Sequence, residues 1–524
     1  MPSTYDEIPY ESQSFPQTHP DRLATIGTLF GMTPPPVDRC RVLELGCAMG
    51  ANLIPMAVGL PDSEFVGYDL SARQIEEARA VVKRLGISNI QLEHRSILDV
   101  GEEVGRFDYI IAHGVYSWVP DAVREKILAI CRERLAQNGV AYVSYNTYPG
   151  WHWRGMIADM MRYHVKQFQE PRMRIAQARA LLDFLVQSVP AKSSDAYSIL
   201  LKAELEMLRG QADWYLFHDH LEEVNDPVYF HQFVERAAAH GLQYLGEADF
   251  SAMLTSGFAP QVGETLRKVA PDIIRMEQYL DFLRNRTFRQ TVLCHQGQQL
   301  VRDLTPEVLK RFSITSPVQS VSASPDVLSS AAEQFRTPNG ATLTTGNPIT
   351  KAAMMVLRKQ WPQLLAFEEL CVASRALLYP GKSLQDPGMV TRADQVLAAE
   401  LLQCYTVNLI ALHRHLPPCV GEVSERPSVS PLVQVQAERG PSVVNQRHET
   451  IRLDEFSRYT VRYLDGHHDY RGLLEELSKL VAQGTLVAQE NGAPVKSPER
   501  IRGAVKEALD KCLPSLARLA LLIA

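Results

Sequence analysis

The sequence lacks paired cysteines and long hydrophobic runs. Its eight cysteines form no CxxC pair and no other close cluster, so a zinc site or a thioredoxin-like site is not expected. No apolar run approaches the ~18 residues needed to cross a bilayer, and the polar N-terminus has no apolar core of a signal peptide. We therefore expect a cytoplasmic protein in a reducing compartment, without membrane insertion.

The sequence also lacks an excess of basic residues. It has 54 Lys and Arg against 60 Asp and Glu, for a net charge of -6, which argues against nucleic acid as a partner. The 30 Gly and 32 Pro among 524 residues are close to average usage and leave no long low-complexity region. A chain of this length and 45% hydrophobic content suggests about three globular domains.

Short apolar stretches alternate with helical periodicity in the first 160 residues. Helices are expected at 19–32, 52–58, 71–85 and 121–135, and strands at 41–45, 64–68, 90–94, 108–112 and 139–145. This alternation is typical of a parallel sheet covered by helices on both faces. The sequence therefore predicts an α/β fold with a Rossmann-like sheet.

The remaining chain changes texture twice. Residues 154–300 have mostly helical periodicity, with a loop in the segment 214–233 that leads into a helix near Pro227. Helices flank a hairpin signal at Asn339-Gly340, which suggests an α+β winged-helix-like module. The predicted regions are 1–40 (N-terminal lid and helix), 41–153 (sheet domain), 154–300 (helical middle domain), 301–420 (winged-helix-like) and 421–524 (α-helical), with a proline-rich linker at 417–441.

The first expected strand ends in a glycine turn. The stretch 41–50, RVLELGCAMG, places Glu44 before a turn that carries Gly46 and Gly50. Glycine there allows close approach of a ligand to backbone N–H groups. The GxGxxG spacing of a dinucleotide site and the lysine of a P-loop are both absent. The ExGxxxG pattern is instead typical of class I methyltransferases, which bind S-adenosylmethionine.

Polar residues follow the next strands at the same sheet edge. Asp69, 23 residues after Gly46, could accept both ribose hydroxyls of the cofactor, and Ser96 and Ile97 lie where an adenine contact belongs. Ligands of open α/β sheets bind at this edge. The candidate cofactor-binding residues of the sheet domain are Glu44, Gly46, Cys47, Gly50, Asn52, Asp69, Leu70, Ser96, Ile97, His113, Gly114, Val115 and Trp118.

Several stretches in residues 1–300 carry a family resemblance. They are 5–10 (YDEIPY), 16–20 (PQTHP), 29–32 (LFGM), 43–47 (LELGC), 52–55 (NLIP), 113–120 (HGVYSWVP), 144–151 (SYNTYPGW), 217–222 (FHDHLE) and 225–230 (NDPVYF). The sequence resembles bacterial class I methyltransferases with a methyltransferase regulatory domain, whose rickettsial-type members are protein lysine methyltransferases of outer-membrane proteins. Ala48 departs from the usual glycine of these enzymes; its methyl group is small enough for the site to survive. The aromatic N-terminal segment could fold over the cofactor as a lid, with Tyr5 and Tyr10 in contact with it.

Two aromatic clusters follow the fourth and fifth strands. A lysine acceptor has a reference pKa of about 10.4 and must lose its proton before it attacks. Aromatic surroundings lower the pKa of an amine by desolvation and stabilise a passing sulfonium. The candidate catalytic residues are Tyr116, Trp118, Asn146, Tyr148, Trp151 and His152.

A histidine-rich segment leaves a metal site as an alternative. His218, Asp219, His220 and Glu222 include an HxH pattern that can ligate zinc or iron. The segment is more typical of a hydrogen-bonded domain interface, so no metal is expected.

Three functions remain open from the sequence. The resemblance implies methyl transfer from S-adenosylmethionine to lysines of a protein, such as an unfolded outer-membrane protein. The alternatives are a small-molecule methyltransferase and a non-catalytic S-adenosylmethionine sensor that binds a partner. The oligomeric state is open, with a dimer among the alternatives.

Overall fold

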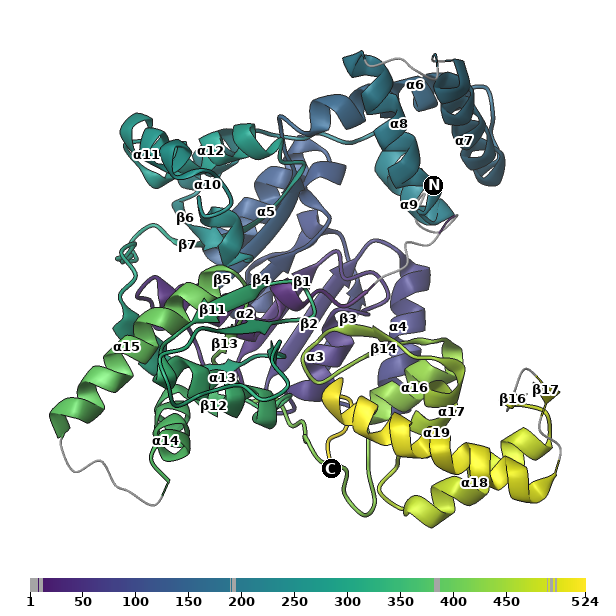
Figure 1. The fold of residues 1–524 in the computed structure, drawn as a ribbon. Coiled ribbons are helices and arrows are strands. Elements are labelled where there is room, and N and C mark those ends of the chain that lie inside the picture. Colours follow the sequence, from purple (N-terminus) through teal and green to yellow (C-terminus); the bar gives the residue numbers. More distant parts are fainter. Residues whose placement is uncertain are drawn as a thin grey trace. The chain divides into compact units, whose positions relative to one another are not determined.

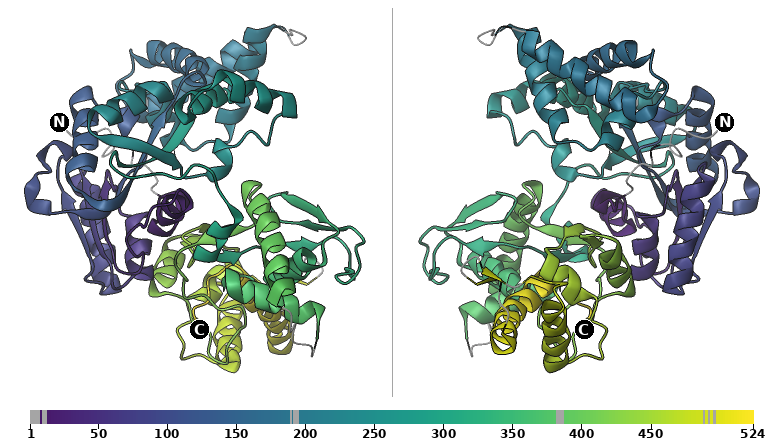
Figure 2. Two further views of the ribbon diagram at one scale, coloured as in Figure 1. Left: turned by 90° about the vertical axis from the view of Figure 1, so that its left-hand side faces the viewer. Right: turned by 90° about the vertical axis from the view of Figure 1, so that its right-hand side faces the viewer.

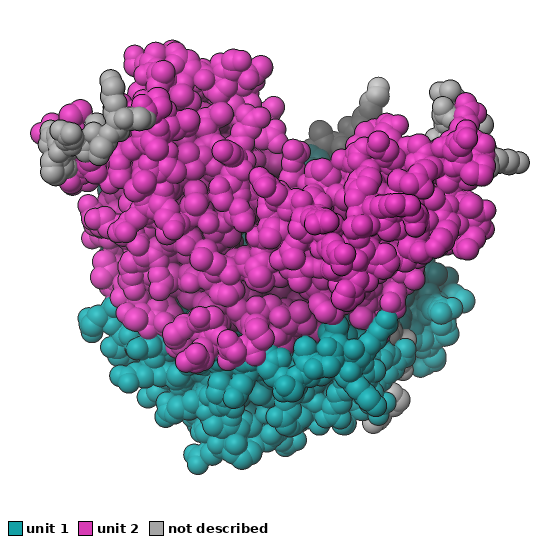
Figure 3. Space-filling model, turned by 90° about the horizontal axis from the view of Figure 1, so that it is seen from below, with its two compact units in different colours: residues 1–13, 40–53, 63–299 teal, residues 14–39, 54–62, 300–524 magenta. Residues whose placement is uncertain are grey.

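The chain folds into two compact units, which Figure 3 shows in two colours. The computed structural model describes residues 8, 13–188, 190, 195–380, 387–487, 489–490, 493–494 and 497–524. Unit 1 consists of residues 1–13, 40–53 and 63–299, and unit 2 of residues 14–39, 54–62 and 300–524. The units are therefore built from interleaved chain segments.

A seven-stranded sheet forms the centre of unit 1 (Figure 1). Its strand order is β3-β2-β1-β4-β5-β7-β6, with β7 antiparallel to both neighbours. The strands are β1 (Arg41–Leu45), β2 (Glu64–Asp69), β3 (Ile90–His94), β4 (Phe107–Ala112), β5 (Leu135–Asn146), β6 (Leu242–Glu247) and β7 (Phe288–His295). The first five are the predicted strands, and β1 to β5 pair in parallel as expected.

The strands β6 and β7 correct the prediction of a helical middle domain at 154–300. β7 pairs with β5 over Ala141–Asn146, so it extends the sheet beyond the predicted domain boundary at residue 153. Both strands are short and bounded by helices, and their pairing partners are distant in sequence. Long-range pairing therefore decided their conformation.

The helices of unit 1 fall into three groups. Helices α4 (Ala72–Leu85) and α5 (Asp121–Glu133) follow β2 and β4 and contact the sheet. Helices α6 (Trp151–Val165), α7 (Pro171–Ser188), α8 (Ala196–Arg209) and α9 (Asp213–His220) share an apolar core that includes Met161 and Phe217. Helices α10 (Phe230–Ala239), α11 (Pro260–Val269) and α12 (Ile273–Arg284) form the third group. Figures 1 and 2 show the last two groups at the end of unit 1 where β4 and β5 finish.

The helix α9 corrects the loop predicted at 214–233. The helix ends at His220, and α10 begins at Phe230, three residues after Pro227. Alternating aromatic and charged residues hide the helical periodicity of α9, although Leu216 and Phe217 are buried on the core of α6–α8.

A buried ion-pair network joins β6, β7 and α12. The guanidinium of Arg289 is fully buried and bonds to carboxylate oxygens of Glu247 at 2.7 Å, Asp281 at 2.8 Å and Glu277 at 3.0 Å. Arg286 adds a second cation at 3.1 Å from Asp281. Burial raises the pKa of Glu277 to about 7, although Arg289 opposes this rise. The network fixes α12 to the antiparallel end of the sheet.

Unit 2 begins with the N-terminal helix and continues after residue 299. It contains α2 (Pro20–Leu29), capped by His19, and the part of α3 (Leu53–Gly59) from Ile54 onward. Two small sheets follow, with orders β11-β10-β9 and β12-β8-β13. Their strands are β8 (Ser313–Thr315), β9 (Gln319–Ser320), β10 (Glu333–Arg336), β11 (Thr342–Thr345), β12 (Leu365–Ala366) and β13 (Ala411–His413), and the helices are α13 (Pro348–Gln360), α14 (Phe367–Leu378) and α15 (Pro387–Thr406). The β10–β11 turn contains Gly340, as the hairpin signal predicted.

The C-terminal part of unit 2 has its own apolar core, which includes Val433, Leu477 and Leu509. It contains α16 (Pro431–Arg439), α17 (Glu455–Val461), α18 (Tyr470–Ala482), α19 (Pro498–Arg518) and the hairpins β14 (Ser442–Val444)–β15 (Thr450–Arg452) and β16 (Gln489–Glu490)–β17 (Ala493–Pro494). The predicted linker at 417–441 is corrected, because α16 occupies its second half. The range 421–524 is mixed α and β rather than purely helical.

Two further features concern the whole described chain. All eight cysteines are described, and they are buried and free. None of the described helices has the length and apolar character needed to cross a membrane.

Candidate active site

The glycine turn after β1 is held tightly by its own backbone. Gly46 and Gly50 have φ values of +78° and +70°, which favour glycine. The N–H groups of Gly46 and Cys47 donate to the Tyr68 carbonyl at 2.8 and 3.1 Å. The Gly50 N–H donates to the Cys47 carbonyl at 2.8 Å. These three amides are therefore bonded within the turn, and the two glycines supply its left-handed backbone.

Gly46 and Ala48 show the steric and backbone constraints on the turn. A Cβ at Gly46 would lie 2.5 Å from Cγ2 of Val115, so a side chain there would collide with the loop after β4. Ala48 has a φ of +48°, a left-handed conformation that favours glycine over other residues. The alanine adopts this conformation, and its N–H donates to Asp69 Oδ2 at 2.8 Å.

Glu44 supplies a buried carboxylate beside the turn. Its Oε1 accepts a hydrogen bond of 2.7 Å from the Asn52 amide, and its Oε2 is buried without a partner among the described residues. Burial raises the pKa of Glu44 to about 7, and the neighbouring Asp69 adds to the rise while Asn52 opposes it. A buried carboxylate oxygen without a partner fits an ammonium group of a ligand.

Asp69 lies at the end of β2 and orders two loops. Its Oδ2 accepts from Ala48 and its Oδ1 from the N–H of Ser71, each at 2.8 Å. An ionised carboxylate can accept about four hydrogen bonds in all. The next residue, Leu70, is 63% exposed and offers an apolar surface beside this carboxylate.

The adenine side of the predicted site follows β3. Ser96 caps the short helix η2 (Ile97–Asp99) by accepting from the N–H of Leu98 at 3.2 Å. Ile97 is buried in the sheet core. The Ser96 side chain thus stabilises the loop, and Ile97 packs beneath it.

The loop after β4 is fixed to β5. His113 Nδ1 lies 2.9 Å from the Tyr142 hydroxyl, and the Gly114 N–H donates to Ser144 Oγ at 2.8 Å. Burial lowers the pKa of His113 to about 4, so the ring is neutral at physiological pH. Val115 and Trp118 continue the loop, and the Trp118 ring meets Trp151 edge-on at 6.3 Å.

The predicted catalytic residues divide into buried and accessible ones. Tyr116 lies in the core against Phe233 at 5.2 Å between ring centroids, and Trp151 is also buried. Asn146 is 5% exposed, and its amide donates to Asn225 Oδ1 at 3.0 Å. Tyr148 is half-buried and His152 is exposed, with their rings stacked at 4.1 Å. Only Trp118, Tyr148 and His152 of the six therefore reach a surface.

Sequence reasoning missed the segment 225–229 as part of the site. Val228 forms a parallel bridge with Thr147, and its carbonyl accepts a 2.7 Å bond from the Thr147 hydroxyl. This pairing brings the Tyr229 hydroxyl to 3.2 Å from His152 Nε2 and the Tyr229 ring to 5.3 Å from Tyr148. The resemblance at 225–230 was the available signal, but it gave no position in space.

The histidine-rich segment does not gather into one site. His218 Nε2 lies 2.6 Å from the Ile8 carbonyl, whereas His220 Nε2 lies 3.2 Å from Glu204 Oε1. No group of three or more His, Cys, Asp or Glu side chains in the described part of the chain is placed to hold a metal ion. His218 instead fixes the N-terminal segment at Ile8 to α9. Tyr5 and Tyr10 lie outside the described residues.

Comparisons with known proteins identify the family of the chain. Three family models match: "Methyltransferase domain" at residues 43–141, "Predicted methyltransferase regulatory domain" at 212–295 and "PKMT, C-terminal winged helix domain" at 425–521. An uncharacterised protein of Rickettsia prowazekii is 39% identical over 526 residues, which cover 99% of this chain and 93% of the relative. The structure of PKMT2 from Rickettsia typhi in complex with AdoHcy has a TM-score of 0.88 and 30% identity, and the match covers 98% of this chain and 100% of PKMT2.

The fold and the glycine-turn site define a class I methyltransferase that uses S-adenosylmethionine. The chain belongs to the family of methyltransferases with a regulatory domain and a PKMT C-terminal winged helix domain. It is similar to PKMT2 of Rickettsia typhi over the whole length of PKMT2. The matched winged helix covers α16 to α19, C-terminal to the range 301–420 where the sequence placed a winged-helix-like module.

A pH experiment tests the role of Glu44. Its pKa is raised when folded, so the wild type should lose stability as the pH rises from about 4.5 to 7, and Glu44→Gln should not. The difference in unfolding free energy, Glu44→Gln minus wild type, should therefore increase by up to about 3 kcal/mol from pH 5 to pH 8. Urea unfolding without cofactor at several pH values measures this difference. Glu76→Gln, at an exposed position, is the control: its difference in unfolding free energy from the wild type should not change with pH. If the curves of unfolding free energy against pH for Glu44→Gln and wild type are parallel, the raised pKa of Glu44 is refuted.

Proposed function

We propose that the protein transfers methyl groups to lysine side chains of a protein substrate. The observation that carries the proposal is the accessible cluster of Tyr148, His152 and Tyr229 at the C-terminal end of β5. It lies at the sheet edge where class I methyltransferases bind their cofactor. Bound S-adenosylmethionine supplies an electrophilic methyl group on a sulfonium.

The cluster has the chemistry to receive an alkylammonium group. Its two tyrosine rings offer aromatic faces to a cation. The pKa of Tyr148 is raised by burial and, to a lesser degree, by the charges of Asp226 and Asp159. The same negative potential that opposes ionisation of the hydroxyl favours arrival of a cation. Desolvation against the exposed side of these rings then lowers the pKa of the amine.

A proton acceptor lies within the cluster. The lysine must lose a proton before its nitrogen lone pair can attack. The exposed imidazole of His152 is hydrogen-bonded to Tyr229 through Nε2, which orients the ring on Tyr148. His152 could take the proton directly or through water, and Tyr229 positions it.

Replacement of Tyr229 by phenylalanine tests this arrangement. The ring remains, but the bond to His152 is lost, so kcat should fall about tenfold with little change in KM. The pH–rate profile of the variant, measured alongside, should differ from that of the wild type because the hydrogen bond between Tyr229 and His152 is absent. Tyr279→Phe removes the hydroxyl of a partly exposed tyrosine on α12 as a matched control and should match the wild type. An unchanged kcat and pH profile in Tyr229→Phe would remove Tyr229 from the mechanism.

Transfer of radiolabelled methyl groups tests the substrate class. The acceptors are unfolded outer-membrane protein, the same protein with its lysines acetylated, and free lysine. We expect label in the first and none in the second. Label in free lysine or small metabolites alone would favour a small-molecule methyltransferase. Cofactor binding without transfer to any acceptor would favour a sensor.

A further inference from the structure

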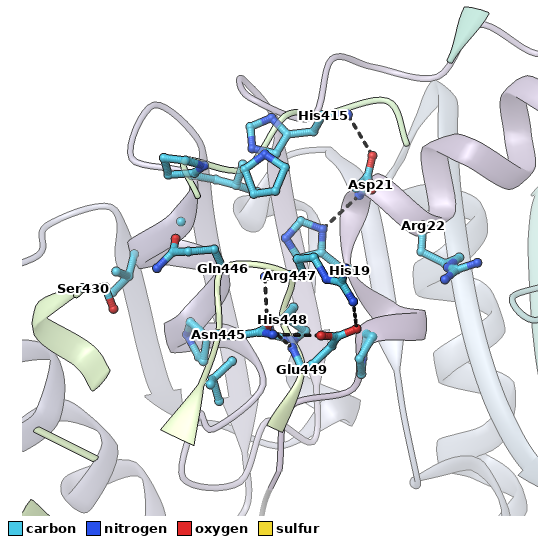
Figure 4. A pocket seen from close by; sticks show the side chains of 18 of the residues that line it. His19, Asp21, Arg22, His415, Ser430, Asn445, Gln446, Arg447, His448 and Glu449 are labelled. Carbon is cyan, nitrogen blue, oxygen red and sulfur yellow. Dashed lines mark hydrogen bonds and ion pairs between the residues drawn. The ribbon is translucent and has the colours of Figure 1, made fainter. Parts of the chain in front are cut away.

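A cavity of about 120 Å³ lies within unit 2 (Figure 4). Most of the residues that line it are distant in sequence from the glycine turn after β1. Four chain segments line it: 16–22 at the start of α2, 55–60 at the end of α3, 411–418 around β13, and 430–449 from α16 to the turn between β14 and β15. All four belong to unit 2. The cavity holds more than a single water molecule, and its lining is rich in histidine and arginine.

The two carboxylates of the cavity already accept hydrogen bonds from other lining residues. Asp21 Oδ2 accepts from His413 Nδ1 at 2.7 Å, and its Oδ1 accepts from the N–H groups of Arg414 and His415 at 2.5 and 2.8 Å. Glu449 accepts from Arg447 Nη2 at 2.6 Å and from the Asn445 amide at 2.8 Å. Both acids therefore have donors within the cavity, and the described residues form no group fit for a metal ion.

The unused hydrogen-bonding capacity consists mainly of donors. The Arg22 guanidinium makes no hydrogen bond or ion pair with any described residue, and Arg447 Nη1 is buried without a partner. Gln446 also lines the cavity. A buried N–H group without an acceptor is unfavourable, so this side of the cavity lacks an acceptor.

His19 adds a further hydrogen-bond donor to the cavity. His19 Nδ1 accepts the Asp21 N–H at 3.2 Å, so the proton of the neutral ring resides on Nε2, which can donate. Burial lowers the pKa of His19 to about 4, and the His448 ring packs 5.3 Å away. The neutral ring offers a donor to a ligand without adding a charge.

We propose that this cavity binds a small oxyanion, a phosphate or carboxylate group, through Arg22, Arg447 and the Nε2–H of His19. Guanidinium groups bind such anions with charge-assisted, often bidentate hydrogen bonds. Because Arg447 already pairs with Glu449, Arg22 provides the guanidinium that has no ion pair with a described residue. The site is independent of the proposed lysine methylation.

Calorimetric titration with inorganic phosphate and with succinate tests the proposal and separates the two sources of oxyanion. The full-length protein is titrated at constant ionic strength, in the presence of saturating S-adenosylhomocysteine so that the cofactor site is blocked. We expect saturable binding of at least one probe with a submillimolar Kd. Absence of saturable binding of both probes would overturn the proposal.

Matched variants locate the binding. Arg22→Gln should weaken the Kd at least about tenfold, and it removes no side-chain hydrogen bond or ion pair with a described residue. His19→Ser keeps an N-cap oxygen for α2 and should weaken it severalfold. Arg336→Gln makes the same charge change on the exposed strand β10, outside the cavity, and should bind as the wild type does. Equal affinities for Arg22→Gln and wild type, or an equal loss in Arg336→Gln, would overturn the site, provided that melting curves show each variant to be folded.

Discussion

Replacement of Asp69 by alanine should weaken binding of S-adenosylmethionine at least about 100-fold. Two hydrogen bonds from ribose hydroxyls to a charged acceptor contribute about 1.5–3 kcal/mol each, and each 1.4 kcal/mol is a factor of ten. The variant also loses the bonds that hold Ala48 and Ser71, so the turn beside the cofactor loosens. Calorimetric titration with S-adenosylmethionine and S-adenosylhomocysteine measures the loss.

The control for this experiment is Asp62→Ala. Asp62 is an exposed aspartate in the loop before β2 and lies outside the predicted site, so its removal should leave the Kd within twofold of the wild type. A folded Asp69→Ala protein that binds cofactor nearly as well as the wild type would show that Asp69 only orders the turn.

Replacement of Arg289 by alanine should have the largest effect on stability. The change leaves Glu247, Glu277 and Asp281 buried with only Arg286 to compensate them. Breaking a buried ion pair in this way costs about 3–5 kcal/mol. In a unit of this size the melting temperature should fall by about 10 °C. Calorimetry or urea unfolding checks the value.

The pH dependence of the stability loss in Arg289→Ala distinguishes uncompensated charge from lost packing as its cause. Burial raises the pKa values of Glu277 and Asp281 even with Arg289 present. Without the arginine, protonation should relieve the repulsion, so the stability deficit should be smaller at pH 5 than at pH 8. A deficit independent of pH would mean that lost packing, such as the contact of Arg289 with the Phe230 ring at 3.8 Å, dominates. The control is Arg275, an exposed residue of α12, the helix that carries Glu277 and Asp281. Arg275→Ala should change the unfolding free energy by less than about 0.5 kcal/mol.

The sequence by itself determined the sheet from β1 to β5 and the chemistry at its edge. Short apolar strands and amphipathic helices carry local periodicity, so their positions and parallel order could be predicted. The glycine turn, Glu44 and Asp69 could be identified because they follow strands whose carboxyl ends meet at one edge. The accessibility of a side chain is not local, and for this reason Tyr116 and Trp151 were assigned to catalysis although they pack in the interior.

Only the tertiary structure decided what depends on contacts between distant segments. β7 became a strand by pairing with β5, more than 140 residues earlier in the chain. Tyr229 reaches His152 because Val228 bridges to Thr147. The oxyanion cavity joins residues 16–22 to residues 430–449. Periodicity and spacing encode neighbours within a few residues, whereas each of these features requires long-range closure of the chain, which is determined by packing of the whole fold.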